Sequence, residues 1–498
     1  MPEKTGGIFG GSRSSPGALP DGNLQPIRDG LAELPRANNV KPGQHISLTE
    51  VYTPPSHRSA LDPDRTLVVG NRGMGKSFWA HALQNSEIRE RAEKVYRQPR
   101  LRDTSAVIGF DGSERTHPIA PNRDEIADAR KAGIDPEDIW RTVLARAVND
   151  GIGRRSPDGF IQQALLISKG RADFSSALTE ADDRLATERK LVLVMFDALD
   201  VLGDNWDETR SLTRGLLRRA LAARSYRSIR FKLFMRSDQF ADSELFNFPD
   251  ASKIRNDRVD LEWPFEQLYG LLFHYLEGSA AAGDCFRNLK HLFSIDARFG
   301  DSGLLDPNVQ KQLVDRIAGE HMGASAKRGR VYSWVPQHLA DANGETAPRT
   351  FLTAWREAAH HGAPPADGRA VDHVGINEGV RRASQDRLAE LKDDYGWISE
   401  VLAPLRDELV PMEKKHLERR WADAGTISML KKRGEEDPKA MPIALTTESV
   451  DALLKTLQAI GVFEVRSNGK INVPDIFRVE AGIKRKGGVK PPIRRGLA

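Results

Sequence analysis

Residues 66–77 read Thr-Leu-Val-Val-Gly-Asn-Arg-Gly-Met-Gly-Lys-Ser, and this stretch decides the fold. Residues 66–69 form a short apolar, β-prone run, while residues 77–84 have a helix-compatible pattern. The three glycines between them let the backbone wrap closely around a small group. The stretch therefore predicts a strand, a tight loop and a helix in direct succession.

This loop has the spacing G-x-x-x-x-G-K-S, which is typical of phosphate binding. In such a loop, several backbone N–H groups converge at a helix N-terminus, whose partial positive charge faces the anion. Lys76 can reach the β and γ phosphates, and the Ser77 hydroxyl can ligate Mg²⁺. We therefore predict an ATP site with Mg²⁺. Its predicted residues are Gly70, Asn71, Arg72, Gly73, Met74, Gly75, Lys76, Ser77 and Phe78.

A site of this kind also needs a strand that ends in an acid, which holds the metal through water. Residues 191–196 are a continuous apolar run followed by Asp197, which we predict as a metal residue beside Ser77. Three positions on, Asp200 is predicted to orient and deprotonate the attacking water, because one acid serves the metal and another the nucleophile. The alternative for Asp200 is a helix cap or a loop acid.

Other apolar runs extend this unit to an α/β P-loop NTPase core, a parallel sheet covered by helices. The further candidate strands are residues 106–110, 191–196, 230–235 and 258–261. After residue 263 the β-type runs stop, and amphipathic patterns predict a helical lid. Near the end, a helix at 447–459 precedes two β-type runs joined by Asn468-Gly469, a strong hairpin signal. This order predicts a C-terminal winged-helix-like module.

Composition adds the boundaries of the domains. We predict a disordered Gly/Ser/Pro-rich tail at 1–23, a P-loop NTPase domain at 24–262, a helical lid at 263–365, a helical and winged-helix-like domain at 366–483, and a basic tail at 484–498. The formal net charge is +4, and six basic residues follow the last acid, Glu480. Such a tail contacts phosphates in some proteins and is a solvated end in most.

Several classes of protein are excluded by what the sequence lacks. No run approaches the roughly 20 apolar residues of a membrane-spanning helix, and the start has no apolar core of a secretory signal. We therefore expect a cytoplasmic protein without membrane contact. The single cysteine, Cys285, excludes an intramolecular disulfide framework, and we interpret it as a packing residue.

The acidic motif carries a family resemblance. Asp197-Ala198-Leu199-Asp200 after an apolar strand resembles the second acidic motif of the NACHT-type branch of the STAND ATPases, signalling relatives of the AAA+ proteins. Those proteins typically continue with a further acid, whereas this chain has Val201, and Ala198 stands where many ATPases carry glutamate. The resemblance implies an ATPase that acts as a bacterial signalling or defence switch, and the departure at Val201 counts against fast hydrolysis.

The same resemblance implies roles for several arginines. Arg236, after the strand at 230–235, is similar to the sensor position near the γ-phosphate, with a surface salt bridge as the alternative. Arg349 resembles the arginine of an AAA+ lid helix that reaches back to the nucleotide, with an exposed arginine as the alternative. Pro264, after Trp263, matches a proline beside the adenine, or marks a domain junction. Arg218 and Arg219 match arginine fingers, although solvated helix residues explain them better.

Three functions remain open from the sequence. The leading one is a regulatory ATPase switch, in which ATP closes the lid and promotes assembly as a homo-oligomer or with a protein partner. The second is a DNA-associated ATPase of the origin-recognition or loader kind, in which the winged module and the basic tail grip DNA. The third is a P-loop kinase or other transferase. The basic residues before the tail are interleaved with acids, which counts against the second.

Overall fold

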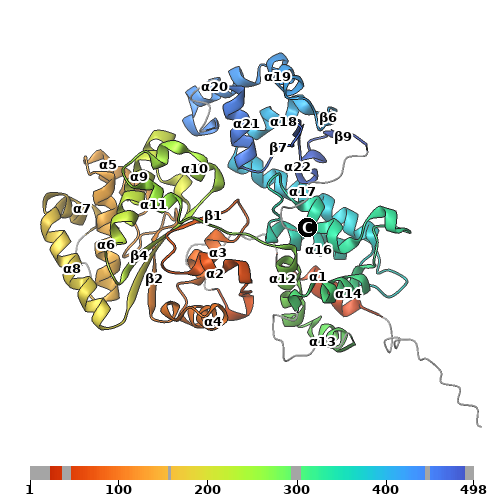
Figure 1. The fold of residues 1–498 in the computed structure, drawn as a ribbon, viewed down its shortest axis with the longest axis horizontal. Coiled ribbons are helices and arrows are strands. Elements are labelled where there is room, and N and C mark those ends of the chain that lie inside the picture. Colours follow the sequence, from red (N-terminus) through yellow and green to blue (C-terminus); the bar gives the residue numbers. More distant parts are fainter. Residues whose placement is uncertain (1–22, 36–45, 155–158, 293–303, 443–448, 488–498) are drawn as a thin grey trace, which may run out of the picture.

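The computed structural model describes residues 23–35, 46–154, 159–292, 304–442 and 449–487 (Figure 1). Most of the predicted disordered tail and residues 488–498 of the predicted basic tail lie outside these ranges, as do the first two residues of the helix predicted at 447–459.

A five-stranded sheet in the order β2-β3-β4-β1-β5 forms the centre of the N-terminal half, and all its pairings are parallel. The strands are β1 (Leu67–Val69), β2 (Thr104–Phe110), β3 (Leu191–Phe196), β4 (Ile229–Met235) and β5 (Val259–Asp260). Each coincides with a predicted apolar run. All six residues of β3 are buried, because helices cover both faces of the sheet. The predicted α/β P-loop core is therefore confirmed.

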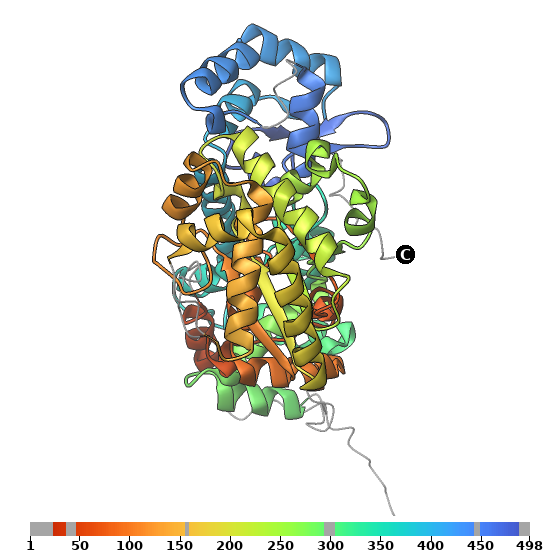
Figure 2. The ribbon, with the colours of Figure 1, turned by 90° about the vertical axis from the view of Figure 1, so that its left-hand side faces the viewer.

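The side chains of each strand alternate between two hydrophobic cores. In β3, Val192, Val194 and Phe196 belong to one core, and Leu191, Leu193 and Met195 belong to the other. The first core is covered by the helices in the foreground of Figure 2. These are α5 (Arg123–Lys131), α6 (Pro136–Gly151), α7 (Phe160–Lys169), α8 (Arg171–Thr187) and α9 (Trp206–Ala223). The opposite face carries α2 (Arg58–Leu61), α3 (Lys76–Ala82) and α4 (Ser86–Tyr96).

Mainly helices follow the sheet from residue 265 to residue 402 in the described part of the chain, with one isolated antiparallel bridge between His321 and Arg330. The helices are α12 (Phe265–Gly278), α13 (Gly283–Leu292), α14 (Pro307–Ala318), α15 (Val331–Leu339), α16 (Pro348–His360), α17 (His373–Asp394) and α18 (Ile398–Leu402). The helix α1 (Gln25–Ala32), placed by the sequence in the predicted 24–262 domain, packs against α16, α12 and α13 instead. Arg28 fixes it there by donating to the carbonyls of Ala370 and His361.

The C-terminal part is joined closely to the preceding helices. A Cβ added to Gly379 of α17 would lie 2.0 Å from the carbonyl oxygen of Ala354 in α16, so only glycine permits this approach. Beyond α17 and α18 lie α19 (Lys414–Asp423), α20 (Thr426–Glu436), α21 (Val450–Ala459) and α22 (Asp475–Arg478). The predicted hairpin is confirmed: β7 (Glu464–Val465) and β8 (Ile471–Asn472) pair antiparallel around Gly469, whose φ is 78°.

The C-terminal end of the described chain adds one further strand pair. Lys484 and Arg485, assigned from sequence to the basic tail, form β9 (Lys484–Arg485), which pairs with β6 (Leu409–Val410). Ion pairs to Asp407 and Asp475 hold these two cations in place. Across the described ranges, no helix has both the length and the apolar character that crossing a membrane requires.

Candidate active site

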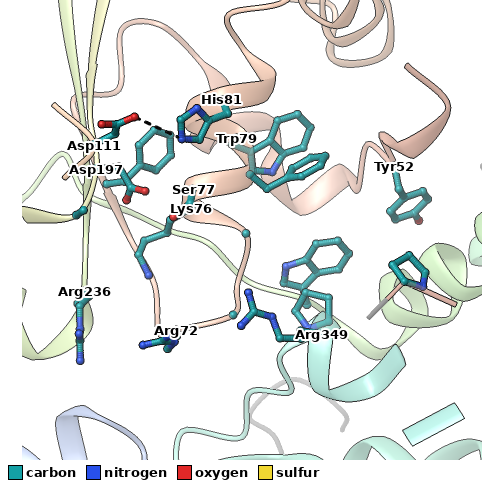
Figure 3. Close-up of a pocket in the computed structure, with 18 of the residues that line it drawn as sticks. Tyr52, Arg72, Lys76, Ser77, Trp79, His81, Asp111, Asp197, Arg236 and Arg349 are labelled. Atoms are coloured by element: carbon teal, nitrogen blue, oxygen red, sulfur yellow. Dashed lines mark ion pairs between the residues drawn. The ribbon is translucent and has the colours of Figure 1, made fainter. Parts of the chain in front are cut away.

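A cavity of about 470 Å³ opens at the carboxyl ends of the central strands, where parallel α/β sheets generally bind ligands (Figure 3). Its walls come from the loop after β1, the ends of β2 to β4, the segment before α2 and the start of α16. Most of the residues predicted from sequence line it: Arg72, Gly73, Gly75, Lys76, Ser77, Phe78, Asp197, Asp200, Arg236 and Arg349.

The loop between β1 and α3 has the conformation that its glycines predict. Gly73 and Gly75 have φ values of 83° and 100°, in the left-handed region that favours glycine. A Cβ on Gly75 would meet open space, so strain rather than crowding requires glycine here. A Cβ on Gly73 would lie 3.3 Å from Cβ of Ala347, which immediately precedes α16. The loop is therefore shaped for backbone contact with a ligand and touches the start of α16.

Lys76 lies inside this loop. Its Nζ donates to the carbonyl oxygens of Gly70 at 2.7 Å and Asn71 at 2.9 Å. Burial lowers the pKa of Lys76 to about 8, and the charge of Asp197 acts in the opposite direction. These carbonyls are neutral acceptors, so a phosphate oxygen would be a stronger partner for the ammonium group.

Ser77 and Asp197 meet where α3 begins beside the end of β3. The Ser77 side chain is hydrogen-bonded to the carboxylate of Asp197. Burial raises the pKa of Asp197, while this hydrogen bond and the charge of Lys76 oppose the increase. A hydroxyl and a carboxylate are oxygen ligands of the kind that Mg²⁺ takes, with phosphate oxygens completing the coordination. The residues present therefore fit a Mg²⁺ ion bound together with a nucleotide.

Arg236 follows β4 and is surrounded by two acids and an aromatic ring. Its guanidinium lies 3.1 Å from Asp200 and 3.3 Å from Asp238, and 4.6 Å above the ring centroid of Tyr395. Burial acts to lower the pKa of Arg236, but the charge of Asp238 and the contacts with Tyr395 and Asp200 raise it overall. The Tyr395 hydroxyl donates to Asp238 at 2.8 Å. Asp200, predicted as the base, is therefore the counter-ion of Arg236.

The remaining predicted residues divide between the cavity and its surroundings. Arg349 lines the cavity and pairs with Glu390 of α17 at 3.0 Å. The Asn71 side chain turns away and donates to the buried Asp341, whose pKa burial raises to about 6. Met74 is buried in the core. Arg218 and Arg219, which do not line the cavity, both pair with Glu137 of α6.

An aromatic wall lies opposite the loop after β1, and Figure 3 shows it around Trp79 and Tyr52. Of this wall, sequence reasoning had predicted only Phe78 and a place beside the adenine for Pro264, which follows Trp263. Trp263 lines this wall and donates from Nε1 to the carbonyl of Met74 at 2.9 Å, which joins the wall to the loop. Trp79, which also lines the cavity, donates to Nδ1 of His57 at 2.9 Å. Burial lowers the pKa of His57 to about 3, so this imidazole is neutral. The flat ring of a nucleotide base can stack on such an aromatic wall.

A second missed feature is the pair His81 and Asp111. His81 lies on α3 one turn after Ser77, and its Nε2 is 3.9 Å from Oδ2 of Asp111. Asp111 directly follows β2, and Figure 3 shows it beside Asp197. The sequence carried a signal for Asp111, because an acid after a predicted parallel strand lies at the ligand-binding edge of the sheet.

Comparisons with known proteins add little to this geometry. The sequence matches no protein-family model and no curated protein. Among solved structures, the Aeropyrum pernix ORC2 protein in ADPNP-ADP complexes shares 14% identity, with 84% of this chain and 86% of that chain covered and a TM-score of 0.39. Drosophila ORC bound to DNA shares 14% identity over 97% of this chain and 95% of that chain, with a TM-score of 0.30. At these scores neither likeness bears on function.

Proposed function

We propose that this protein binds ATP with Mg²⁺ in the cavity, hydrolyses it, and works as a nucleotide-dependent switch. The observation that carries the proposal is the Lys76 ammonium group, held by two backbone carbonyls in a left-handed glycine loop beside the Ser77–Asp197 pair. In this proposal Lys76 exchanges those carbonyls for phosphate oxygens. Bound Mg²⁺ would supply positive charge to the β and γ phosphates. The adenine base of ATP would stack against the aromatic wall.

The switch is supported by contacts between the C-terminal part and the residues around the γ-phosphate position. Tyr395 packs on Arg236, and Asp394 pairs with Arg72 of the phosphate loop. Lys439 donates to the carbonyl of Asp200 at 2.9 Å. A γ-phosphate is an alternative partner for Arg236 and Arg72, so its arrival would compete with these contacts. Nucleotide state would thus be coupled to the position of the C-terminal part and, through it, to assembly.

Arg349 extends the same proposal to the lid. It lines the cavity from the first turn of α16, and its guanidinium pairs with Glu390 of α17. We propose that ATP draws Arg349 toward the phosphates and pulls α16 over the cavity. Because Gly375 and Gly379 lock α17 against α16, this movement would carry α17 and the elements beyond it.

Equilibrium binding of a fluorescent ATP analogue tests the central claim. Replacing Lys76 by Ala is expected to weaken binding by at least about tenfold, because a charge-assisted hydrogen bond is worth about 1.5–3 kcal/mol. Lys253→Ala is the matched control, since Lys253 is 62% exposed on α11 (Ala251–Arg255). Equal affinities of Lys76→Ala and the wild type would refute the proposed site.

A second candidate function is a DNA-associated ATPase. It is favoured by the succession of α19, α20 and α21 followed by the β7–β8 hairpin, the order of a winged-helix module. Many of the cations there are neutralised: Lys470 pairs with Glu413, and Arg466 with Glu464. A mobility shift with duplex DNA that weakens steeply with salt would support this function, and unchanged mobility at low salt would remove it.

A further inference from the structure

Four carboxylates line the cavity among the described residues: Glu50, Asp111, Asp197 and Asp200. Asp197 is hydrogen-bonded to Ser77 at the position for the metal. Glu50 accepts from the backbone N–H of Ser47 at 2.7 Å and caps a short helix turn. Asp200 pairs with Arg236. Asp197 therefore lies at the metal position, Glu50 caps a turn and Asp200 is a counter-ion, whereas the fourth carboxylate, Asp111, has only the backbone N–H of Ser113 and the imidazole of His81 beside it.

Both polar groups of Asp200 are held by cations. Its carboxylate faces the guanidinium of Arg236 at 3.1 Å, and its backbone carbonyl is held by Lys439. Moving a proton onto Asp200 would break an ion pair in the site. This cost counts against Asp200 as the base.

The loop that carries Asp111 lies directly against the loop after Asp197. Phe110 of β2 is paired with Phe196 of β3, and the N–H of Asp197 donates to the carbonyl of Phe110 at 2.8 Å. A Cβ on Gly112 would lie 3.2 Å from Cβ of Ala198. Asp111 therefore stands beside the residue that follows the metal acid, and the methyl side chain of that residue accepts no proton.

The Asp111 carboxylate is oriented by its own loop. Oδ1 accepts from the backbone N–H of Ser113 at 3.0 Å, an arrangement that fixes the side chain relative to the backbone. Oδ2 faces Nε2 of His81, which belongs to the phosphate-binding helix α3. One oxygen is thus held by the loop after β2, and the other faces His81 of α3; Asp111 and His81 both line the cavity.

We propose that Asp111 is the proton acceptor for the attacking water, an inference that rests on the proposed function. The water oxygen forms a bond to the γ-phosphorus as the bond from that phosphorus to the β,γ-bridging oxygen breaks. The bridging oxygen leaves with the electron pair on ADP, where the charge of Lys76 stabilises it. One water proton passes to Oδ2 of Asp111. Asp200 instead keeps Arg236 in position.

The test compares Asp111→Asn, Asp200→Asn and the exposed control Asp128→Asn on α5 for ATP affinity and turnover. For Asp111→Asn, affinity within about threefold of the wild type and turnover at least about a hundredfold lower are expected, because a general base contributes about 10²–10⁴-fold. Asp200→Asn should lower turnover by less than about tenfold. A second measurement does not depend on the rate. Each protein is incubated with ATP and separated from free nucleotide by gel filtration, and the nucleotide that stays bound is identified. It should be ATP in Asp111→Asn and ADP in the wild type.

Two results would overturn the inference alone: wild-type turnover in Asp111→Asn, or loss of ATP affinity in that variant. If Asp111→Asn does not fold, Asp111→Ser is measured in the same way and the same outcomes decide. A wild-type protein that fails to bind ATP would overturn the proposed function, and with it this inference. Binding and turnover by the wild type therefore distinguish failure of the proposed function from failure of the inference about Asp111.

Discussion

The pKa of Lys76 predicts that ATP affinity falls as the pH rises above 8. Burial places this pKa at about 8 in the nucleotide-free protein, against 10.5 for an ordinary lysine. Bound phosphates would hold the ammonium form, so deprotonation of the free protein competes with binding. The apparent dissociation constant should rise by a factor of 1 + 10^(pH − 8), which is about 1.1 at pH 7, about 2 at pH 8 and about 11 at pH 9. The last factor corresponds to about 1.4 kcal/mol.

The stability of the nucleotide-free protein should change in the opposite direction. Between pH 8 and 10.5 the folded state binds fewer protons at Lys76 than the unfolded state does, because its folded pKa is the lower one. The contribution of Lys76 to the free energy of unfolding therefore rises with pH across this window and is lost as the pH falls through 8.

Fluorescent ATP titrations at pH 7, 8 and 9 with saturating Mg²⁺ check the affinity. Lys76→Met is the matched control: it has no titrating group at this position, so its residual affinity should change by less than about twofold over the same range. An affinity for the wild type that stays constant or increases from pH 7 to pH 9 would refute the reasoning. So would a pH dependence of equal size in Lys76→Met.

Two further substitutions test packing and the switch. Gly379→Ala should lower the melting temperature by about 3 °C or more, because its Cβ would overlap the Ala354 carbonyl. Gly278→Ala is the control and should leave the melting temperature unchanged, because a Cβ there meets nothing within 4 Å. Equal melting temperatures of the two variants would contradict the close packing at Gly379. Lys439→Ala should raise the fraction of assembled protein at a fixed ATP concentration, measured by light scattering, because it removes a donor to the Asp200 loop. Exposed Lys432 supplies the control, Lys432→Ala, and identical assembly of the two variants would count against the proposed coupling.

The central sheet was predictable because its signal is local. Strands buried on both faces read as continuous apolar runs, as β3 does, and the glycine loop carries its own backbone requirement at Gly73 and Gly75. The hairpin at Gly469 was predictable for the same reason. In each case the residues that determine the conformation are adjacent in the sequence.

The partners of the site residues were not predictable, because they come from distant positions. Tyr395 lies 157 residues from Asp238, and Lys439 lies 239 residues from Asp200. No period or composition in one segment indicates which side chain of another segment will meet it. The same limit explains β9, since Lys484 reads as part of a cationic tail until β6 is seen beside it.

Catalysis and sensing would then lie on opposite sides of β3. On the β2 side, Asp111 faces α3, and on the β4 side, Arg236 contacts Tyr395 of the C-terminal part. Asp111→Asn should therefore stop proton transfer without loosening the C-terminal part, whereas Lys439→Ala should loosen it without changing the rate per bound ATP. Asp111 is held by Ser113 and His81, whereas Lys439 donates to the carbonyls of Asp200 and Gly203. Because these side chains have different partners in the described part of the chain, their effects should add in the double variant to within about 0.5 kcal/mol. A larger interaction energy would mean that one element performs both tasks.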